Sequence, residues 1–174
     1  MSQRNYTEAA DLFEKCLESK KKDIPGIADG TLIGLFVECC WRSEQHERAI
    51  LCLKSYLSVW DEQFELHRYA HACLQLGHLC SYLSHDQEAM NYFRKSLTYY
   101  APILKSVEED KEYSISFFDE RACALIGMQS ILLKRKRWHE ALICCDQRKA
   151  PVLVNHIAKR ISPFITYSIP STAL

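Results

Sequence analysis

Small and large apolar residues recur at a fixed interval along the chain. Three rows place a small residue, a large apolar residue four positions later and a leucine four after that: Ala9-x3-Phe13-x3-Leu17, Ala49-x3-Leu53-x3-Leu57 and Ala89-x3-Phe93-x3-Leu97. Successive alanines are 40 residues apart. Positions i, i+4 and i+8 share one helical face, and an alanine there lets a neighbouring helix approach closely. The rows predict equivalent helices of a repeat, with Ala49 and Ala89 buried at helix crossings.

A second apolar stripe precedes each of the last two rows. The stripes consist of Ile33, Phe36, Val37 and Cys40, and of Cys73, Leu76, Gly77 and Cys80. A short polar stretch joins each stripe to the next helix, and Ser84-x-x-Gln87 is a capping box that would open that helix. Five glycines and five prolines are too few for a turn-rich β fold. Each unit is therefore predicted to be a helix–turn–helix.

A fourth unit follows after an insertion. Its first stripe consists of Ala122, Leu125, Met128, Gln129 and Leu132, and residues 138–142 open its second helix. The charged run 108–112 lies in the insertion and indicates a longer helix or a solvated loop. The expected organisation is the second helix of an incomplete unit at 1–22, units at 30–63 and 64–102, an insertion at 103–118, a unit with a terminal helix at 119–160, and a disordered tail at 161–174.

The unit at 64–102 resembles the tetratricopeptide (TPR) repeat. Cys73-x2-Leu76-Gly77-x2-Cys80, Ala89-x3-Phe93 and Pro102 are similar to the pattern W-x2-L-G-x2-Y … A-x3-F … P. Cysteines replace both aromatic residues, and the proline is one residue late. The resemblance implies an all-α, right-handed α-solenoid with a period of about 40 residues. It also implies a scaffold or adaptor that binds proteins along a concave groove, rather than an enzyme.

Residues 114–157 resemble the last TPR unit before the caspase-like domain of TPR–CHAT proteins. The resemblance rests on residues 114–117, 132–142 and 146–153, and Pro151 departs from the helical run of that family. The first helix of the chain also lacks a partner stripe of its own. We therefore expect a piece or short isoform of a longer array. The alternative function is a regulatory array that positions or restrains a CHAT domain.

Composition argues against other classes of function. Lys and Arg together number 22, as do Asp and Glu, and a net charge of zero disfavours nucleic acid and anionic membranes as partners. Nine cysteines without a CxxC pair, and without a signal peptide ahead of them, suggest reduced thiols in the cytoplasm. No nucleophile loop or phosphate-binding glycine loop is recognisable. We expect no catalytic residue, no cofactor and no metal.

The predicted binding groove lies on the flank beside the packing stripes. His67, His71, Leu74 and His78 share that flank, but the outer histidines are about 16 Å apart along a helix, which disfavours a shared metal ion. The flank is therefore expected to bind a protein or peptide of acidic or aromatic character. Because histidine titrates near pH 6.5, acidic ligands should bind more tightly as the pH falls from about 7.5 to about 6. Self-association through exposed end repeats is left open. The groove is predicted to comprise Trp41, Arg42, His71, Leu74, His78 and Tyr82.

Overall fold

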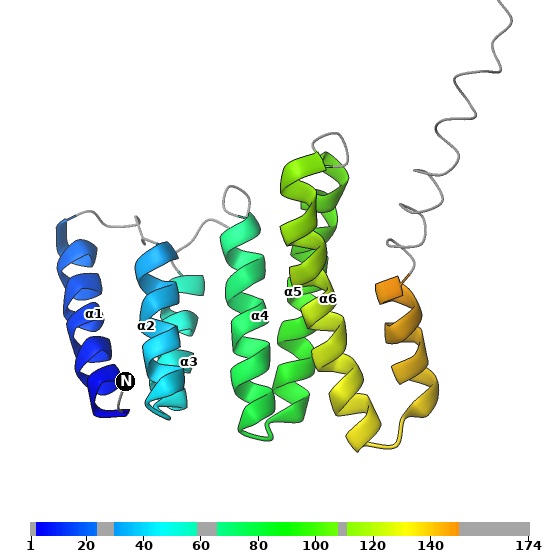
Figure 1. Ribbon diagram of the computed structural model, residues 1–174, viewed down its shortest axis with the longest axis horizontal. Coiled ribbons are helices and arrows are strands. Elements are labelled where there is room, and N and C mark those ends of the chain that lie inside the picture. The colour runs from blue at the N-terminus through cyan, green and yellow to red at the C-terminus, as the bar shows by residue number, and fades with distance from the viewer. Residues whose placement is uncertain (1–2, 24–29, 59–65, 108–110, 150–174) are drawn as a thin grey trace, which may run out of the picture. The chain divides into compact units, whose positions relative to one another are not determined.

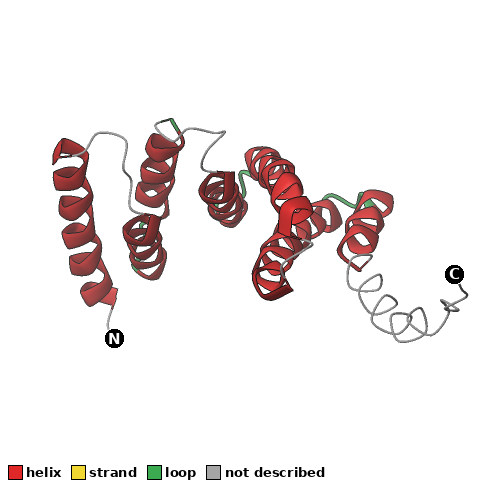
Figure 2. Cartoon of the chain, turned by 90° about the horizontal axis from the view of Figure 1, so that it is seen from above, coloured by secondary structure: helices red, strands yellow, loops and turns green. Residues whose placement is uncertain are grey.

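The computed structural model describes residues 3–23, 30–58, 66–107 and 111–149, which are helical apart from short turns (Figure 1, Figure 2). No residue within these ranges belongs to a strand. The prediction of an all-α fold built from TPR-like helix–turn–helix repeats is confirmed. The helices are α1 (Gln3–Asp23), α2 (Gly30–Arg42), α3 (His46–Leu57), α4 (Leu66–Tyr82), α5 (Asp86–Val107) and α6 (Lys111–Lys134), followed by a helix at 138–149.

The chain divides into two compact units, residues 1–124 and 125–174. In the first unit, α1 packs against α2, α2 against α3, α3 against α4, and α4 against α5. The second unit contains the C-terminal part of α6 and the helix at 138–149. The predicted terminal helix after Pro151 and the predicted disordered tail at 161–174 lie outside the described residues.

Three turns between paired helices share one backbone geometry. Their central residues Glu44, Ser84 and Lys136 have φ values of 61°, 62° and 58°, in the left-handed region. After each of them, an amide donates to the carbonyl oxygen five residues earlier: Gln45 to Cys40 at 2.8 Å, His85 to Cys80 at 2.8 Å and Arg137 to Leu132 at 2.9 Å. The left-handed residues are 40 and 52 residues apart, which is also the spacing of Ala49, Ala89 and Ala141.

The geometry of the second turn overturns the predicted capping box. Ser84 adopts a left-handed conformation, and α5 begins only at Asp86. The amides of Ser84 and His85 donate to the carbonyls of Ser81 and Cys80, so the turn closes back onto the end of α4. Ser84 therefore belongs to the exit from α4 rather than to the cap of α5.

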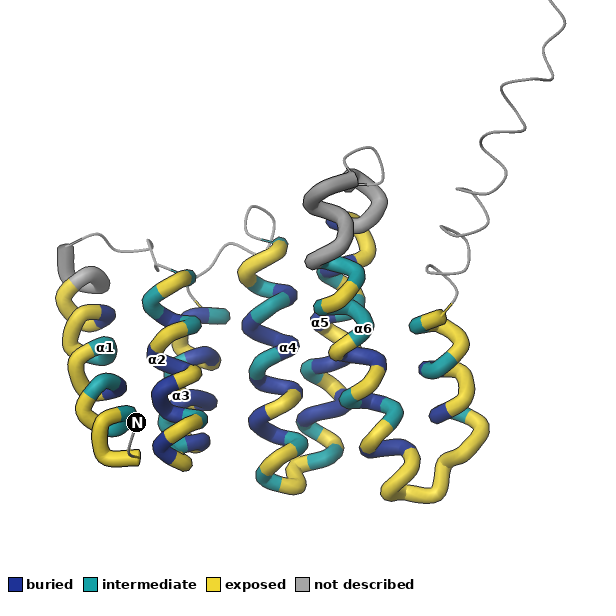
Figure 3. Tube along the Cα trace, viewed as in Figure 1, coloured by how far each residue is buried: buried dark blue, intermediate teal, exposed yellow. Residues whose placement is uncertain are grey.

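The predicted packing stripes form the core of the first unit. Both four-residue stripes, on α2 and α4, are buried, and Ala49 and Ala89 are fully buried as expected (Figure 3). In α1 the buried face is displaced, because Ala10 and Leu17 are buried whereas Ala9 and Phe13 are half-buried. Leu17 is thus buried as the predicted row requires, but Ala10 rather than Ala9 is the buried alanine, so the buried face is only partly rotated from that row.

Gly77 sets the distance between α4 and α5. A Cβ atom at this position would lie 2.6 Å from both Cδ1 and Cε1 of Phe93, which is fully buried. Such a distance is shorter than van der Waals contact, and a fully buried ring has little room to move. The missing side chain therefore allows the ring of Phe93 to pack directly against the backbone of α4.

Residues inserted before the fourth unit lengthen α5 at its C-terminal end and α6 at its N-terminal end. α5 extends past Pro102 to Val107, and α6 begins at Lys111. Within the first unit, Tyr100 and Ile103 of α5 form a buried cluster with Ala70 of α4, and Phe117 of α6 packs against it. The N-terminal half of α6 is thereby placed beside α4.

Candidate binding face formed by α2 and α4

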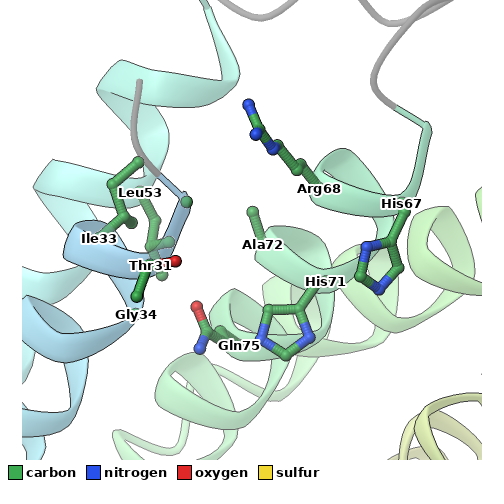
Figure 4. Close-up of a pocket in the computed structure, with 10 residues that line it drawn as sticks. Thr31, Ile33, Gly34, Leu53, His67, Arg68, His71, Ala72 and Gln75 are labelled. Carbon is green, nitrogen blue, oxygen red and sulfur yellow. The ribbon is translucent and has the colours of Figure 1, made fainter. Parts of the chain in front are cut away.

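A cleft of about 290 Å³ opens between α2 and α4 (Figure 4). Its apolar lining comes from Ile33 of α2, Leu53 of α3 and Ala72 of α4. Two glycines of α2, Gly30 and Gly34, add a stretch without side chains. The polar lining residues are Thr31, His67, Arg68, His71 and Gln75.

The polar lining is rich in hydrogen-bond donors and carries positive charge. Arg68 extends towards the start of α2, where its Nε atom would be 3.5 Å from a Cβ at Gly30. A guanidinium offers five N–H donors and stays ionised, and amide and hydroxyl groups add further donors. No carboxylate occurs among the described residues that line the cleft. The described part of the lining thus consists mostly of groups that can donate hydrogen bonds.

A carboxylate lies behind the two histidines. Glu120 of α6 approaches His67 Nε2 at 3.5 Å and His71 Nδ1 at 3.4 Å, and it accepts a hydrogen bond from the hydroxyl of Tyr100. Burial of the carboxyl opposes ionisation, but these three neighbours outweigh it and hold the pKa of Glu120 well below its usual range. Burial and the hydrogen bond to Glu120 raise the pKa of Tyr100. Glu120 is thus an anion that ties α6 to α4 and α5.

The rings of Trp41, His46 and Tyr82 cluster at the C-terminal ends of α2 and α4. Trp41 lies at a centroid distance of 5.2 Å from Tyr82 and 5.0 Å from His46, and His46 lies 4.5 Å from Tyr82. Trp41 is half-buried and Tyr82 is 60% exposed, whereas His46 is buried. Such tilted ring pairs are favourable. They fix the end of α2 against the end of α4 and still leave aromatic surface open to solvent.

The six residues of the predicted groove fall into different surroundings. Trp41 and Tyr82 are in contact, and His71 lines the cleft beside Glu120. Arg42 is exposed and donates from Nε to Glu38 at 2.8 Å. Leu74 is buried, so it belongs to the core rather than to the surface of a groove.

His78 is exposed, and its ring lies edge-on to Phe93 with a centroid distance of 5.1 Å. Desolvation by the groups around the ring lowers the pKa of His78 below its ordinary value of 6.5. His78 therefore carries less positive charge at mildly acid pH than an ordinary histidine would.

Sequence reasoning did not find four residues of this face. Arg68 and Gln75 follow from the helical flank of His71, since they lie three positions before it and four positions after it. Glu120 carried no such signal, because it lies on another helix beyond the insertion. His46 belongs to the polar turn in the sequence and becomes buried only through Trp41 and Tyr82.

Several chemistries find no support in the described part of the chain. No three His, Cys, Asp or Glu side chains there are arranged to hold a metal ion. None of the helices in those ranges has the length and apolarity needed to cross a bilayer. All nine cysteines are free, and burial raises the pKa of both Cys40 and Cys80 to about 11. Thiols with such pKa values are poor nucleophiles at neutral pH.

Comparison with known protein families supports the repeat. The tetratricopeptide repeat family matches residues 70–101, which include most of α4 and the first sixteen residues of α5. Searches of curated proteins and of solved structures gave no match. The family match supports a TPR-family protein. TPR repeats generally mediate protein–protein interactions, and the family is typically a non-enzymatic scaffold.

Proposed function

We propose that the chain is an interaction module that binds a protein or peptide along the face formed by α2 and α4. The main support is the open cleft between these helices, lined by the flank that the repeat pattern singled out. The half-buried Trp41 and the exposed Tyr82 are in contact and add aromatic surface to the same two helices. Aromatic and arginine side chains contribute much of the energy at protein interfaces. Nine free cysteines support an adaptor that works in the cytoplasm.

An alternative is a regulatory role beside a CHAT-type domain. It is supported by the resemblance of residues 114–157 and by the exposed apolar surface of the helix at 138–149. Trp138 is 59% exposed and Leu142 is 63% exposed, one helical turn apart. Apolar patches of this kind commonly contact another protein or domain. Reading the coding sequence beyond Leu174 for a caspase-like domain separates this alternative from the first.

The first proposal predicts that binding depends on the aromatic pair. A double variant Trp41→Ala/Tyr82→Ala should bind partners recovered from a pull-down about tenfold more weakly, since exposed aromatic anchors are common hot spots. Leu51→Ala is the matched control, because Leu51 is 69% exposed but lies on α3. Titration calorimetry of an identified partner against all three proteins provides the measurement. Equal affinities for the double variant and the wild type would place the partner elsewhere.

A pH titration tests the histidines of the same face. A His71→Ala/His78→Ala variant should lose the expected strengthening of acidic ligands between about pH 7.5 and about pH 6. His78→Ala alone should keep most of it, because the pKa of His78 is already lowered. If the double variant retains both affinity and pH dependence, these histidines are not part of the binding site.

A further inference from the structure

The second unit of the chain is strongly basic, although the whole chain has no net charge. Residues 125–174 contain eight Lys and Arg but only two Asp and Glu, which gives a net charge of +6. Residues 1–124 contain 14 basic and 20 acidic residues, so their net charge of −6 balances it. The total of zero therefore does not describe the second unit, whose charge favours an acidic partner.

The turn that opens the helix at 138–149 shows which of its residues correspond to those of α3. The left-handed residues of the two turns each lie five positions before a buried alanine. Counted from these turns, Trp138 corresponds to His46 and Leu142 to Ile50. The two residues of α3 are buried, whereas their counterparts in the second unit are more than half exposed. Equivalent positions of the repeat are thus covered in one unit and open in the other.

In the first unit, the covering element is the first helix of the next repeat. α4 packs against α3, and the ring of Tyr82 lies edge-on to that of His46 with a centroid distance of 4.5 Å. Tyr82 is the last residue of α4 and His46 the first of α3, so the two helices run antiparallel. Within the described ranges, no helix follows residues 138–149. Trp138 and Leu142 therefore form a face that suits a helix docked in the same antiparallel manner.

Two exposed lysines lie at the turn beside this face. Lys134 and Lys136 are exposed, and neither forms an ion pair in the part of the chain that the structure describes. Arg137, in contrast, donates two hydrogen bonds of 2.6 Å to Glu140. A helix docked in the manner of α4 would end near the two lysines, where its last carbonyl groups carry partial negative charge. Carboxylates in its last turn would add charge-assisted hydrogen bonds.

Building on the proposed function, we propose that the second unit binds an acidic amphipathic helix of a partner protein along residues 138–149. The apolar stripe of the partner covers Trp138 and Leu142, and carboxylates near its C-terminal end meet Lys134 and Lys136. A helix is favoured over a lipid surface because a helix covers the same positions of α3. Symmetric pairing of two copies through this face is disfavoured, since each would bring a unit of charge +6.

Tryptophan indole signals report on this face. The chain has three tryptophans, and the N–H groups of their rings give separate signals in a ¹⁵N correlation spectrum, which replacement by phenylalanine assigns. The probes are three capped, alanine-based helical peptides titrated into the full chain. All carry the same leucine stripe, and their last turns contain two Glu, two Gln or two Lys. The Glu peptide should shift the signal of Trp138 and bind about fivefold more tightly than the Gln peptide.

A pair of double variants tests the role of charge. Lys134→Gln/Lys136→Gln should bind the Glu and Gln peptides equally, because the cations that favour glutamate are gone. Arg94→Gln/Lys95→Gln is the matched control, since it removes two exposed positive charges from α5 in the first unit. This control should keep the fivefold preference of about the wild-type size.

A pair of leucine variants tests the role of packing. Leu142→Ala should weaken the binding of all three peptides about fivefold, because it removes apolar surface from the proposed contact. Leu51→Ala is the control, since Leu51 is similarly exposed but lies on α3. Both side chains are mostly exposed, so thermal melts of the two variants should match that of the wild type.

Four results would overturn the inference. Trp138 keeps its signal with the Glu peptide, or the preference for Glu survives in Lys134→Gln/Lys136→Gln. Trp138 responds to vesicles that contain phosphatidylserine but to none of the peptides, or its signal shifts with the concentration of the chain alone, which would identify a second copy as the occupant. The proposed function has a separate readout, because a partner on the face formed by α2 and α4 shifts the signal of Trp41 instead.

Discussion

Replacing Gly77 by alanine should lower the free energy of unfolding by about 2 kcal/mol, although alanine is the better helix former. A Cβ at this position would lie 2.6 Å from two ring carbons of Phe93. The ring is fully buried, so α4 and α5 must separate or the ring must leave its preferred rotamer. Urea unfolding monitored by circular dichroism gives the change.

The control for this prediction is the same substitution at Gly34. Alanine there meets no atom within 4 Å, so Gly34→Ala should raise the free energy of unfolding by about 0.5–1 kcal/mol. The change from glycine to alanine is thus expected to lower the free energy of unfolding at Gly77 and to raise it at Gly34. A second variant, Gly77→Ala/Phe93→Leu, should lose less than the two single costs added together, since the smaller side chain makes room for the methyl group. Destabilisation of equal size at both glycines would show that the packing of Phe93 is not the cause.

The repeat register was predictable because it depends on local periodicity. Alanine followed by a large apolar residue at i+4 indicates a helix crossing wherever it occurs, and Ala49 and Ala89 are fully buried. The stripes on α2 and α4 followed from the same rule. α1 departs from it in part, because Ala10 takes the place expected for Ala9 where this helix packs against α2.

The turns were predictable in position but not in conformation. Glu44, Ser84 and Lys136 share a left-handed backbone, and none of them is glycine. Their conformation is imposed by the backbone hydrogen bonds that close the turn onto the preceding helix. A polar sequence such as Ser84-x-x-Gln87 is therefore compatible with a capping box at the start of α5 and also with a turn that closes onto the end of α4. Only the folded structure distinguishes these two conformations.

The candidate site was predictable to the extent that it lies on one helical flank. His71 lines the cleft together with its neighbours on α4, as periodicity suggests. Leu74 occupies the same predicted flank but is buried, because eight of the 17 residues of α4 are buried and this wide buried face includes part of the flank. The contact with Glu120 depends on how far α5 and α6 extend through the insertion, and spacing along the sequence does not contain that information.

Replacing Glu120 by glutamine should lower the free energy of unfolding by about 2 kcal/mol at pH 7. Only 21% of the Glu120 side chain is exposed, and the hydroxyl of Tyr100 donates to its carboxylate. Glutamine keeps the size and one acceptor but removes the charge that attracts His67 and His71. Tyr100→Phe removes one donor and leaves the histidines in place, so it should cost less than Glu120→Gln.

The pH dependence of this difference follows from the lowered pKa of Glu120. The folded-state pKa lies below the ordinary value of 4.5, so the native state favours the carboxylate over its protonated form. The resulting stabilisation is complete above about pH 4.5 and is lost as the pH falls below it towards the folded-state pKa. Other carboxyl groups titrate in the same range, but they are common to the wild type and to Glu120→Gln.

Urea unfolding of both proteins at several pH values between 7 and about 3 isolates the contribution of Glu120. The two stabilities should differ at about pH 5 and converge as the pH falls below about 4.5. His67 and His71 both face the carboxylate of Glu120 in the folded protein. A difference that stays constant down to pH 3 would mean that Glu120 stabilises the fold by packing alone. A difference that grows as the pH falls below about 4.5 would contradict a lowered pKa for this carboxyl group.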